Sequence, residues 1–325
     1  MQRIYTSAII GAGNIAANYD GPDDSMVLTH AHAMKSCDRL NFLGFYDVQL
    51  DRAEQAARKW GVEAFSTMDA LMARGVDMLV IAAPNVEHDA LLRAVIGYTR
   101  LVLCEKPLTT DYAGSLDIVT AYQQRNIPLA VNYQRRYDPT VCDLKEKAER
   151  SELGAFLGGS VLYSKGIKHN GSHAVDLLRY IFGEVTGLTA TGHVYDHSKT
   201  DPTVSGIIFL HDKQVHLIAG NENDFSMFEI DLIFQRGRYR FVQSGLSVER
   251  YEVNDDPVFA GYREMVPVAR EQTGLGQALS LMARDLVAHL DGAKELRIAA
   301  SGVLNTQYVC ERLADAPLHQ HIRLE

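Results

Sequence analysis

The residues of this chain with the clearest chemical potential are Glu105 and Lys106, which are followed by Pro107. The apolar run 101–103 before them predicts a buried strand, and the polar run 109–111 after them predicts the start of a helix. In an open parallel sheet, the carboxyl end of a strand is where ligands bind. Lys106 could therefore aim its ammonium at a reacting oxygen. The alternative is an ordinary surface ion pair at a strand exit.

A second candidate is His173. Apolar residues at helical spacing predict a helix over 170–182, which Asn170 or Ser172 can cap. The pKa range of histidine suits a group that takes up and returns a proton. The alternatives are a histidine packed over the helix start, or a metal pair with His169, against which the lack of an apparent third ligand argues.

The composition is that of an ordinary globular protein with 325 residues, 46% of them hydrophobic and 22% charged, which is enough for two domains. The net charge of -9 argues against nucleic acid or an anionic membrane as a main partner. No signal pattern opens the chain and no apolar run reaches membrane-spanning length, so we expect a cytoplasmic protein. Widely spaced cysteines indicate neither a disulfide framework nor a zinc site and favour a reducing compartment: Cys37, Cys104, Cys142 and Cys310.

The elements that must position the candidates begin with a predicted strand at 5–10 and the glycine run GAGNIA at 11–16. Glycines there permit a tight turn and the close approach of a pyrophosphate to backbone N–H groups at a helix start. A second predicted strand, 41–46, ends at Asp47, whose carboxylate can accept hydrogen bonds from both adenosine ribose hydroxyls and would repel a 2′-phosphate. This pattern predicts NAD rather than NADP. The alternative is that Asp47 only begins the turn before the helix predicted at 51–60.

Between these two strands the spacing is longer than usual, which indicates an inserted loop at 19–27 before His30 and His32. Those two histidines lie on different faces of a helix, so a metal pair is not expected there. Three more strands alternate with two helices and predict a parallel sheet: strands 78–82, 101–104 and 128–131, and helices 87–97 and 111–125.

We place a domain boundary before residue 128, which predicts domains over 1–127 and 128–325. The second domain shows strand-like alternation with short turns, which indicates mostly antiparallel sheet. Strands at 215–219 and 227–234 carry apolar residues in both alternating sets, which predicts a sheet face that needs a partner. Two further helices, 276–290 and 295–314, end the chain.

Five motifs of this chain resemble, in order, those of the glucose–fructose oxidoreductase and inositol dehydrogenase (Gfo/Idh/MocA) family: 11–16, Asp47, 83–85, 105–107 and 171–176. The resemblance extends through the helix predicted at 170–182. It implies an α/β protein with an N-terminal Rossmann dinucleotide-binding domain and a C-terminal α/β domain built on a large, mostly antiparallel open sheet. Family members often use that sheet for homo-oligomer contacts, so a dimer or tetramer is expected.

The resemblance also implies roles for single residues. Lys106 would bind the reacting hydroxyl, His173 would exchange its proton, and the Lys106–Pro107 bond is a candidate for the cis isomer. Many members carry an Asp four residues before the histidine, where this chain has His169. His169 is therefore a third catalytic candidate, and the proton relay can differ from that of members with the Asp.

The expected cofactor-binding residues are Gly11, Gly13, Asn14, Ile15, Asp47, Ala83, Pro84, Asn85, His88, Glu105, Lys106 and Arg135. The expected substrate-binding residues are Lys106, Tyr163, Lys165, Asn170 and His173, although Tyr163, Lys165 and Asn170 could equally serve strand ends. No metal is expected.

These expectations describe an NAD-dependent oxidoreductase that transfers a hydride between nicotinamide and a secondary alcohol of a sugar, cyclitol or related polyol. A different class of function, a non-catalytic sensor that binds dinucleotide, would use the same fold without needing Lys106 and His173. A glycoside hydrolase that works through a redox step would use the same pair of residues and release a free sugar.

Overall fold

Two sheets organise the computed structural model, which describes residues 3–324, and they confirm the predicted α/β class. The chain forms two units. Unit 1 runs to Tyr137 and resumes over Gly276–Leu304, and unit 2 holds Asp138–Leu275 and the residues from Asn305 onward. Nothing in the sequence predicted the return of 276–304 to unit 1. The domain boundary placed before residue 128 stays a prediction.

Unit 1 is built on a six-stranded sheet in which every neighbouring pair is parallel, in the order β3-β2-β1-β4-β5-β6. All of β4 and β5 and most of β1 are buried, as expected for apolar strands covered by helices on both faces. The order reverses between β1 and β4, which opens a crevice at the carboxyl ends of these strands. The strands are β1 (Tyr5–Ile10), β2 (Leu40–Tyr46), β3 (Glu63–Phe65), β4 (Met78–Ile81), β5 (Leu101–Cys104) and β6 (Leu129–Val131).

The helices of unit 1 follow from apolar faces and local caps. In α2 the alanines and Trp60 form the buried face, and the helix ends at Gly61, whose φ of 62° is left-handed. Asp111 caps α5 by accepting a hydrogen bond from the Gly114 N–H at 2.8 Å. The helices are α1 (His30–Lys35), α2 (Leu50–Trp60), α3 (Met68–Met72), α4 (His88–Val95), α5 (Tyr112–Gln124) and α8 (Ala278–Leu290).

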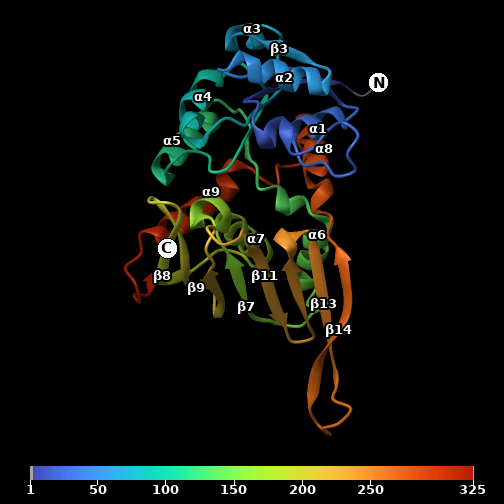
Figure 1. Cartoon of the computed structure of the whole chain (residues 1–325), viewed down its shortest axis with the longest axis vertical. Helices are drawn as coiled ribbons and strands as arrows, with labels where there is room; N and C mark the ends of the chain where they lie inside the picture. Colours follow the sequence, from blue (N-terminus) through green and yellow to red (C-terminus); the bar gives the residue numbers. More distant parts are fainter. Residues whose placement is uncertain (1–2, 325) are drawn as a thin grey trace. The chain divides into compact units, whose positions relative to one another are not determined.

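The helix expected to start after the glycine run, for which no length was predicted, is short. Only a five-residue π turn, η1 (Asn14–Asn18), follows the glycines, and the inserted loop then leads to α1. The side chain of Thr29 accepts a hydrogen bond from the His32 N–H, which fixes the start of α1 at residue 30. Figure 1 shows α8 of the returning segment beside α1.

Unit 2 is built on a nine-stranded sheet in the order β14-β13-β12-β11-β7-β10-β9-β8-β15. Among the strands of the described residues, only β7 and β10 pair in parallel, so the predicted, mostly antiparallel sheet is confirmed. Residues of three helices, α6 (Pro139–Glu149), α7 (Ser172–Phe182) and α9 (Ala300–Ala314), share its buried core. The strands are β7 (Phe156–Tyr163), β8 (Gly187–Ser198), β9 (Asp201–Leu210), β10 (Lys213–Ala219), β11 (Phe228–Phe234), β12 (Gly237–Val242), β13 (Ser247–Asp255), β14 (Arg263–Gln272) and β15 (Ile322–Arg323).

The two strands expected to be apolar in both alternating sets are less uniform than predicted. In β11, every second residue from Phe228 to Phe234 is buried, and the set between them holds Glu229, Asp231 and Ile233. In β10 the more exposed set includes His216 and Ile218. The outer face of the sheet is therefore mixed in polarity.

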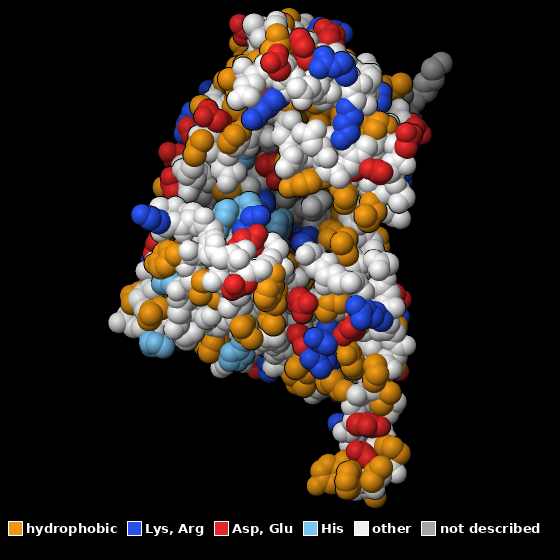
Figure 2. All heavy atoms as spheres, in the orientation of Figure 1, with side chains coloured by type: hydrophobic (Ala, Val, Ile, Leu, Met, Phe, Trp, Pro, Cys, Tyr) orange, Lys and Arg blue, Asp and Glu red, His pale blue; other side chains and the backbone are white. Residues whose placement is uncertain are grey.

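The hairpin of β13 and β14 extends beyond β12, so that its last pairs join only these two strands. Apolar side chains gather at its tip (Figure 2), where Val258, Phe259 and Tyr262 are exposed. Within residues 3–324, no helix combines the length and the apolar character needed to cross a membrane.

Candidate active site

The glycine run makes a tight turn at the carboxyl end of β1. Gly11 has a φ of +97°, and a Cβ on it would lie 2.5 Å from the carbonyl oxygen of Ala82, so only glycine fits this close crossing of β4. A Cβ on Gly13 would meet no atom within 4 Å. The turn therefore leaves open space beside Gly13, into which the phosphates of a dinucleotide could come close to the backbone.

Asp47 is held at the end of β2 beside this turn. One carboxylate oxygen accepts the Ala12 N–H and the other accepts the Gln49 N–H, both at 2.9 Å. The next residue is Val48, which is uncharged and 87% exposed. No cationic side chain therefore follows Asp47 directly. The arrangement fits a dinucleotide whose ribose hydroxyls donate to Asp47.

Ala83 and Pro84 follow β4, and Asn85 begins the short 3-10 turn η2 (Asn85–Glu87) at the same sheet edge. His88, which we expected to bind the cofactor, braces two loops. Its ring is fully buried, with Nδ1 2.9 Å from the Pro107 carbonyl oxygen and Nε2 3.0 Å from the Ala83 carbonyl oxygen. The ring can donate to either carbonyl, and its burial between the two loops indicates a structural role, while cofactor binding by His88 stays a prediction.

Glu105 and Lys106 directly follow β5, and the Lys106–Pro107 bond is cis, the isomer for which the family resemblance made it a candidate. The Glu105 carboxylate is buried, and its Oε1 accepts hydrogen bonds from His30 Nε2 at 2.7 Å and Asn132 Nδ2 at 2.6 Å. The Lys106 N–H points to Oε2 at 3.3 Å. Burial alone would raise the pKa of Glu105, but the hydrogen bonds from His30 and Asn132 and the nearby Lys106 charge lower it below its usual range.

Sequence reasoning missed His30 and Asn132 as parts of this site. The sequence pattern argued against a metal pair of His30 with His32 and indicated no other partner for His30. Asn132 directly follows β6, and that position at the ligand-binding sheet edge was a usable signal. Arg135 lies three residues further on in the turn η3 (Gln134–Tyr137) and is half-buried.

The predicted substrate residues of unit 2 surround the π turn η4 (Gly166–Gly171) and the start of α7. Lys165 precedes the turn with a φ of 73°, an unusual conformation for a residue with a side chain. His173 is half-buried in the first turn of α7, and its ring meets that of Phe228 edge-on at 6.3 Å. The ring of His169 lies 4.7 Å from that of His197.

Asn170 does not cap α7, and neither does Ser172. The Asn170 Nδ2 donates to the carbonyl oxygens of Ser164 and Met227, at 3.0 and 3.2 Å, and α7 starts after Gly171 without a side-chain cap. The side chain of Asn170 therefore pins the turn to β7 and β11. The capping prediction is wrong because the turn supplies a longer-range partner for this amide.

Tyr163, which we expected to bind the substrate, has no surface with which to contact one. Its side chain is completely buried, and its hydroxyl donates to the Val204 carbonyl and accepts from the Val204 N–H, both at 2.9 Å. Tyr163 is a core residue of unit 2 that joins β7 to β9.

Two acidic residues that the sequence did not predict organise the surroundings of Lys165. Asp196 accepts hydrogen bonds from the backbone N–H groups of Lys165 and Glu222, both at 2.9 Å. The Lys165 ammonium lies 3.6 Å from a Glu222 carboxylate oxygen. Against the opposing effect of burial, hydrogen bonds lower the pKa of both carboxyls, so both stay ionised at neutral pH.

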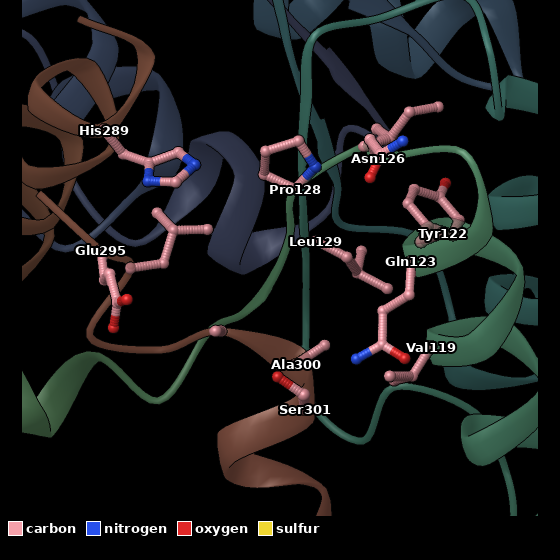
Figure 3. A pocket seen from close by; sticks show the side chains of 13 residues that line it. Val119, Tyr122, Gln123, Asn126, Pro128, Leu129, His289, Glu295, Ala300 and Ser301 are labelled. Carbon is pink, nitrogen blue, oxygen red and sulfur yellow. The ribbon is translucent and has the colours of Figure 1, made fainter. Parts of the chain in front are cut away.

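A cavity of about 540 Å³ in unit 1 lies away from the predicted residues. It is found at the amino end of β6, near Pro128 and Leu129, with Gln123, Glu295 and Ser301 on its walls (Figure 3). The glycine turn and Lys106 are at the carboxyl ends of the strands, so this cavity is not the site of the proposed chemistry. Among residues 3–324, no group of three or more histidine, cysteine, aspartate or glutamate side chains is placed to hold a metal ion.

Comparison with known proteins identifies relatives of this architecture. Residues 6–133 match the profile of the oxidoreductase family with an NAD-binding Rossmann fold, Gfo/Idh/MocA. An inositol 2-dehydrogenase of Mycolicibacterium gilvum is 33% identical over 200 residues, which cover 56% of this chain and 55% of that protein. The chain thus spans about half the length of the curated relatives it matches.

Two solved structures share the fold over nearly the whole chain. One is an oxidoreductase from Desulfitobacterium hafniense described as NADPH-dependent, with a TM-score of 0.83, 17% identity, and coverage of 99% of this chain and 98% of that one. The other is an oxidoreductase from Agrobacterium radiobacter in complex with NAD+, L-tartaric acid and magnesium, with a TM-score of 0.77, 18% identity and 98% coverage of both chains.

Proposed function

Since residues 6–133 belong to the Gfo/Idh/MocA oxidoreductase family with its NAD-binding Rossmann fold, we propose that the chain is an NAD-dependent dehydrogenase of polyols. The substrate would be a sugar, a cyclitol or a related polyol that carries an oxidisable secondary alcohol. The name of the inositol 2-dehydrogenase relative supports this substrate class. The four free cysteines are consistent with a cytoplasmic location.

The observation that carries the proposal is the set of polar groups on one sheet edge of unit 1. The glycine turn ends β1, Asp47 ends β2, and Glu105 with Lys106 ends β5. This edge would place a dinucleotide across the crevice between β1 and β4. Lys106 would then lie at the nicotinamide end, where the reacting alcohol must bind.

Asp47 supports NAD as the cofactor. Its carboxylate is fixed by two backbone N–H groups and would accept the ribose hydroxyls, whereas a 2′-phosphate would place a second anion beside it. The bound nicotinamide supplies the acceptor for the hydride that leaves the carbinol carbon.

Lys106 and His173 would both act on the reacting alcohol. The Lys106 ammonium would bind the hydroxyl oxygen and stabilise the negative charge that develops there as the hydride leaves. His173 would take up the hydroxyl proton as a general base. His169, one helical turn earlier, would assist the proton transfer in place of the Asp found in many members.

The test is NAD reduction, followed by NADH absorbance, across a panel of inositols, hexoses and sugar acids. The first prediction is that Lys106→Met and His173→Ala each lower kcat by about 10²- to 10⁴-fold, because each removes a group assigned to the reacting alcohol. The affinity for NAD, measured by titration calorimetry, should change little.

Two exposed residues supply matched controls: Lys35→Met at the end of α1 and His211→Ala in the turn before β10 should keep the wild-type rate. A wild-type rate for Lys106→Met on a confirmed substrate would contradict the assignment. NAD binding without turnover of any panel member would indicate the sensor function instead.

A further inference from the structure

Two histidines of α1 each form a buried hydrogen bond to a carboxylate, and the two bonds lead to different parts of unit 1. His30 Nε2 lies 2.7 Å from Glu105 Oε1, whereas His32 Nδ1 lies 2.8 Å from Asp20 Oδ2. The exposed fraction of His30 is 1% and that of His32 is 6%. The His30–Glu105 pair lies next to Lys106 in the chain, and the His32–Asp20 pair holds the inserted loop 19–27.

We propose that His30 is a positioning residue of the dehydrogenase: it holds Glu105 in the one orientation that places Lys106 against the alcohol oxygen. This inference rests on the proposed function, because it assigns His30 a role in the same reaction. His30 itself would not touch the substrate, since its ring is buried and its Nε2 is bonded to Glu105.

The hydrogen bonds of Glu105 show how His30 could control Lys106. One carboxylate oxygen accepts from both His30 and Asn132, and the other faces the backbone N–H of Lys106. The Lys106 backbone is therefore tied to the carboxylate that His30 orients. A shift of about 1 Å at a reacting group can cost on the order of 10²-fold in rate, so the position of this carboxylate matters for catalysis.

Asn132 depends on the same carboxylate. Its Oδ1 is buried and has no hydrogen-bond partner among the described residues, and its Nδ2 donates to Glu105. If Glu105 rotates after the loss of His30, the amide of Asn132 loses its fixed partner as well. The three side chains His30, Glu105 and Asn132 thus form one unit.

The charged groups around Glu105 predict a second effect of His30, on the pH dependence of the activity. The titratable groups that face it are His30 from α1, with Lys106 and Cys104 on its own strand. Burial raises the pKa of Glu105 and the hydrogen bonds from His30 and Asn132 lower it. Without His30, the pKa of Glu105 should rise, so that on acidification the carboxyl takes up a proton at a higher pH and this protonation adds to that of the general base His173 in lowering the activity.

The different ring atoms of the two pairs allow a reciprocal experiment. Glutamine places an amide N–H near the position of histidine Nε2, whereas asparagine places one near Nδ1. Since Glu105 is bonded to Nε2 of His30, His30→Gln should keep the bond and His30→Asn should lose it. Since Asp20 is hydrogen-bonded to Nδ1 of His32, His32→Asn should keep that hydrogen bond and His32→Gln should lose it.

The second prediction is therefore that His30→Asn lowers kcat by about 10- to 100-fold on a confirmed substrate, while KM changes less. The acid limb of the kcat–pH profile should move to higher pH in the same variant. His30→Gln should recover most of the rate and the wild-type profile. His32→Gln and His32→Asn should both keep kcat within about twofold, although His32→Gln should lower Tm.

Equal kcat values for His30→Asn and His30→Gln would overturn the inference, and so would an acid limb that stays in place in His30→Asn. If His30→Asn does not fold, a wild-type kcat in His30→Leu, which also lacks a donor for Glu105, would overturn it in the same way. The absence of turnover by the wild-type protein would instead refute the proposed function, and this inference would fail with it.

Discussion

At the scale of single residues, the candidate site depends on side chains whose partners are unusually well defined. Asp47 uses both carboxylate oxygens on backbone N–H groups, and Glu105 accepts from three donors. Such fixed carboxylates keep their orientation, which is what recognition of hydroxyl groups requires. The cofactor preference can therefore be tested at one residue.

The third prediction is that Asp47→Ala weakens NAD binding and narrows the preference for NAD over NADP. The variant loses the acceptor for the ribose hydroxyls and also the charge that repels a 2′-phosphate, so the two affinities should approach each other. Loss of a charge-assisted hydrogen bond is worth about 1.5–3 kcal/mol, which corresponds to roughly 10- to 100-fold in affinity. The measurement is calorimetric titration with both cofactors.

The matched control is Asp51→Ala, an exposed aspartate in the first turn of α2. Asp51→Ala changes the net charge of the chain by the same amount as Asp47→Ala, but it leaves the carboxylate at the end of β2 in place. Equal affinities of the wild-type protein for NAD and NADP would show that Asp47 does not select the cofactor.

At the scale of elements, β2 carries an irregularity that sets where Asp47 emerges. The register of β1 and β2 shifts by one residue just before Gly44, whose φ is +149°. A Cβ on Gly44 would lie 1.8 Å from the carbonyl oxygen of Glu63 in β3. Only glycine therefore allows β3 to pair at this point, and Asp47 follows three residues later.

The fourth prediction is that Gly44→Ala lowers the free energy of unfolding by about 3 kcal/mol, because the new methyl group must push β3 away. Gly61→Ala is the matched control. Gly61 also has a positive φ, 62°, but a Cβ on it would meet no atom within 4 Å, so the expected loss is only about 1 kcal/mol. Chemical denaturation of both variants gives the comparison, and equal losses would contradict the steric argument.

At the scale of the whole molecule, the outer face of the nine-stranded sheet is the surface on which we expect two copies of the chain to meet. Ile218 on β10 is 47% exposed, and Ile233 on β11 is half-buried, beside the ion pair of Asp231 with Arg238. This mixture of apolar and charged groups is typical of the surface that subunits share. The polar outward residues do not exclude assembly, although they make the face less apolar than the sequence pattern indicated.

The fifth prediction is that the protein is a homo-oligomer in light scattering at micromolar concentration, and that the double variant Ile218→Asp, Ile233→Asp has the mass of a monomer. Two carboxylates would be buried without partners in the interface, which is costly. Leu116→Asp, at an exposed position of α5 in unit 1, should keep the wild-type mass. A monomeric wild-type protein would contradict the prediction.

The sequence by itself determined those features that depend on neighbours along the chain. The glycine run, Asp47 and Glu105–Lys106 could be placed at strand ends because apolar runs and turn residues show where a strand stops. The alternation of strands and helices in unit 1, apart from β3, α3 and the returning segment 276–304, and the antiparallel character of unit 2 followed from the same local patterns. The family resemblance, rather than a local pattern, made the Lys106–Pro107 bond a candidate for the cis isomer that it has.

Only the tertiary structure decided which side chains of these elements meet. His30 and Glu105 are separated by 75 residues, and no local pattern reports that α1 packs against the end of β5. Tyr163 and His88 have side chains that could serve a ligand, but their long-range partners, Val204 and Pro107, keep them in the interior. The residue type limits what a side chain can bind. Burial and distance determine what it does bind, and both arise only when remote segments pack.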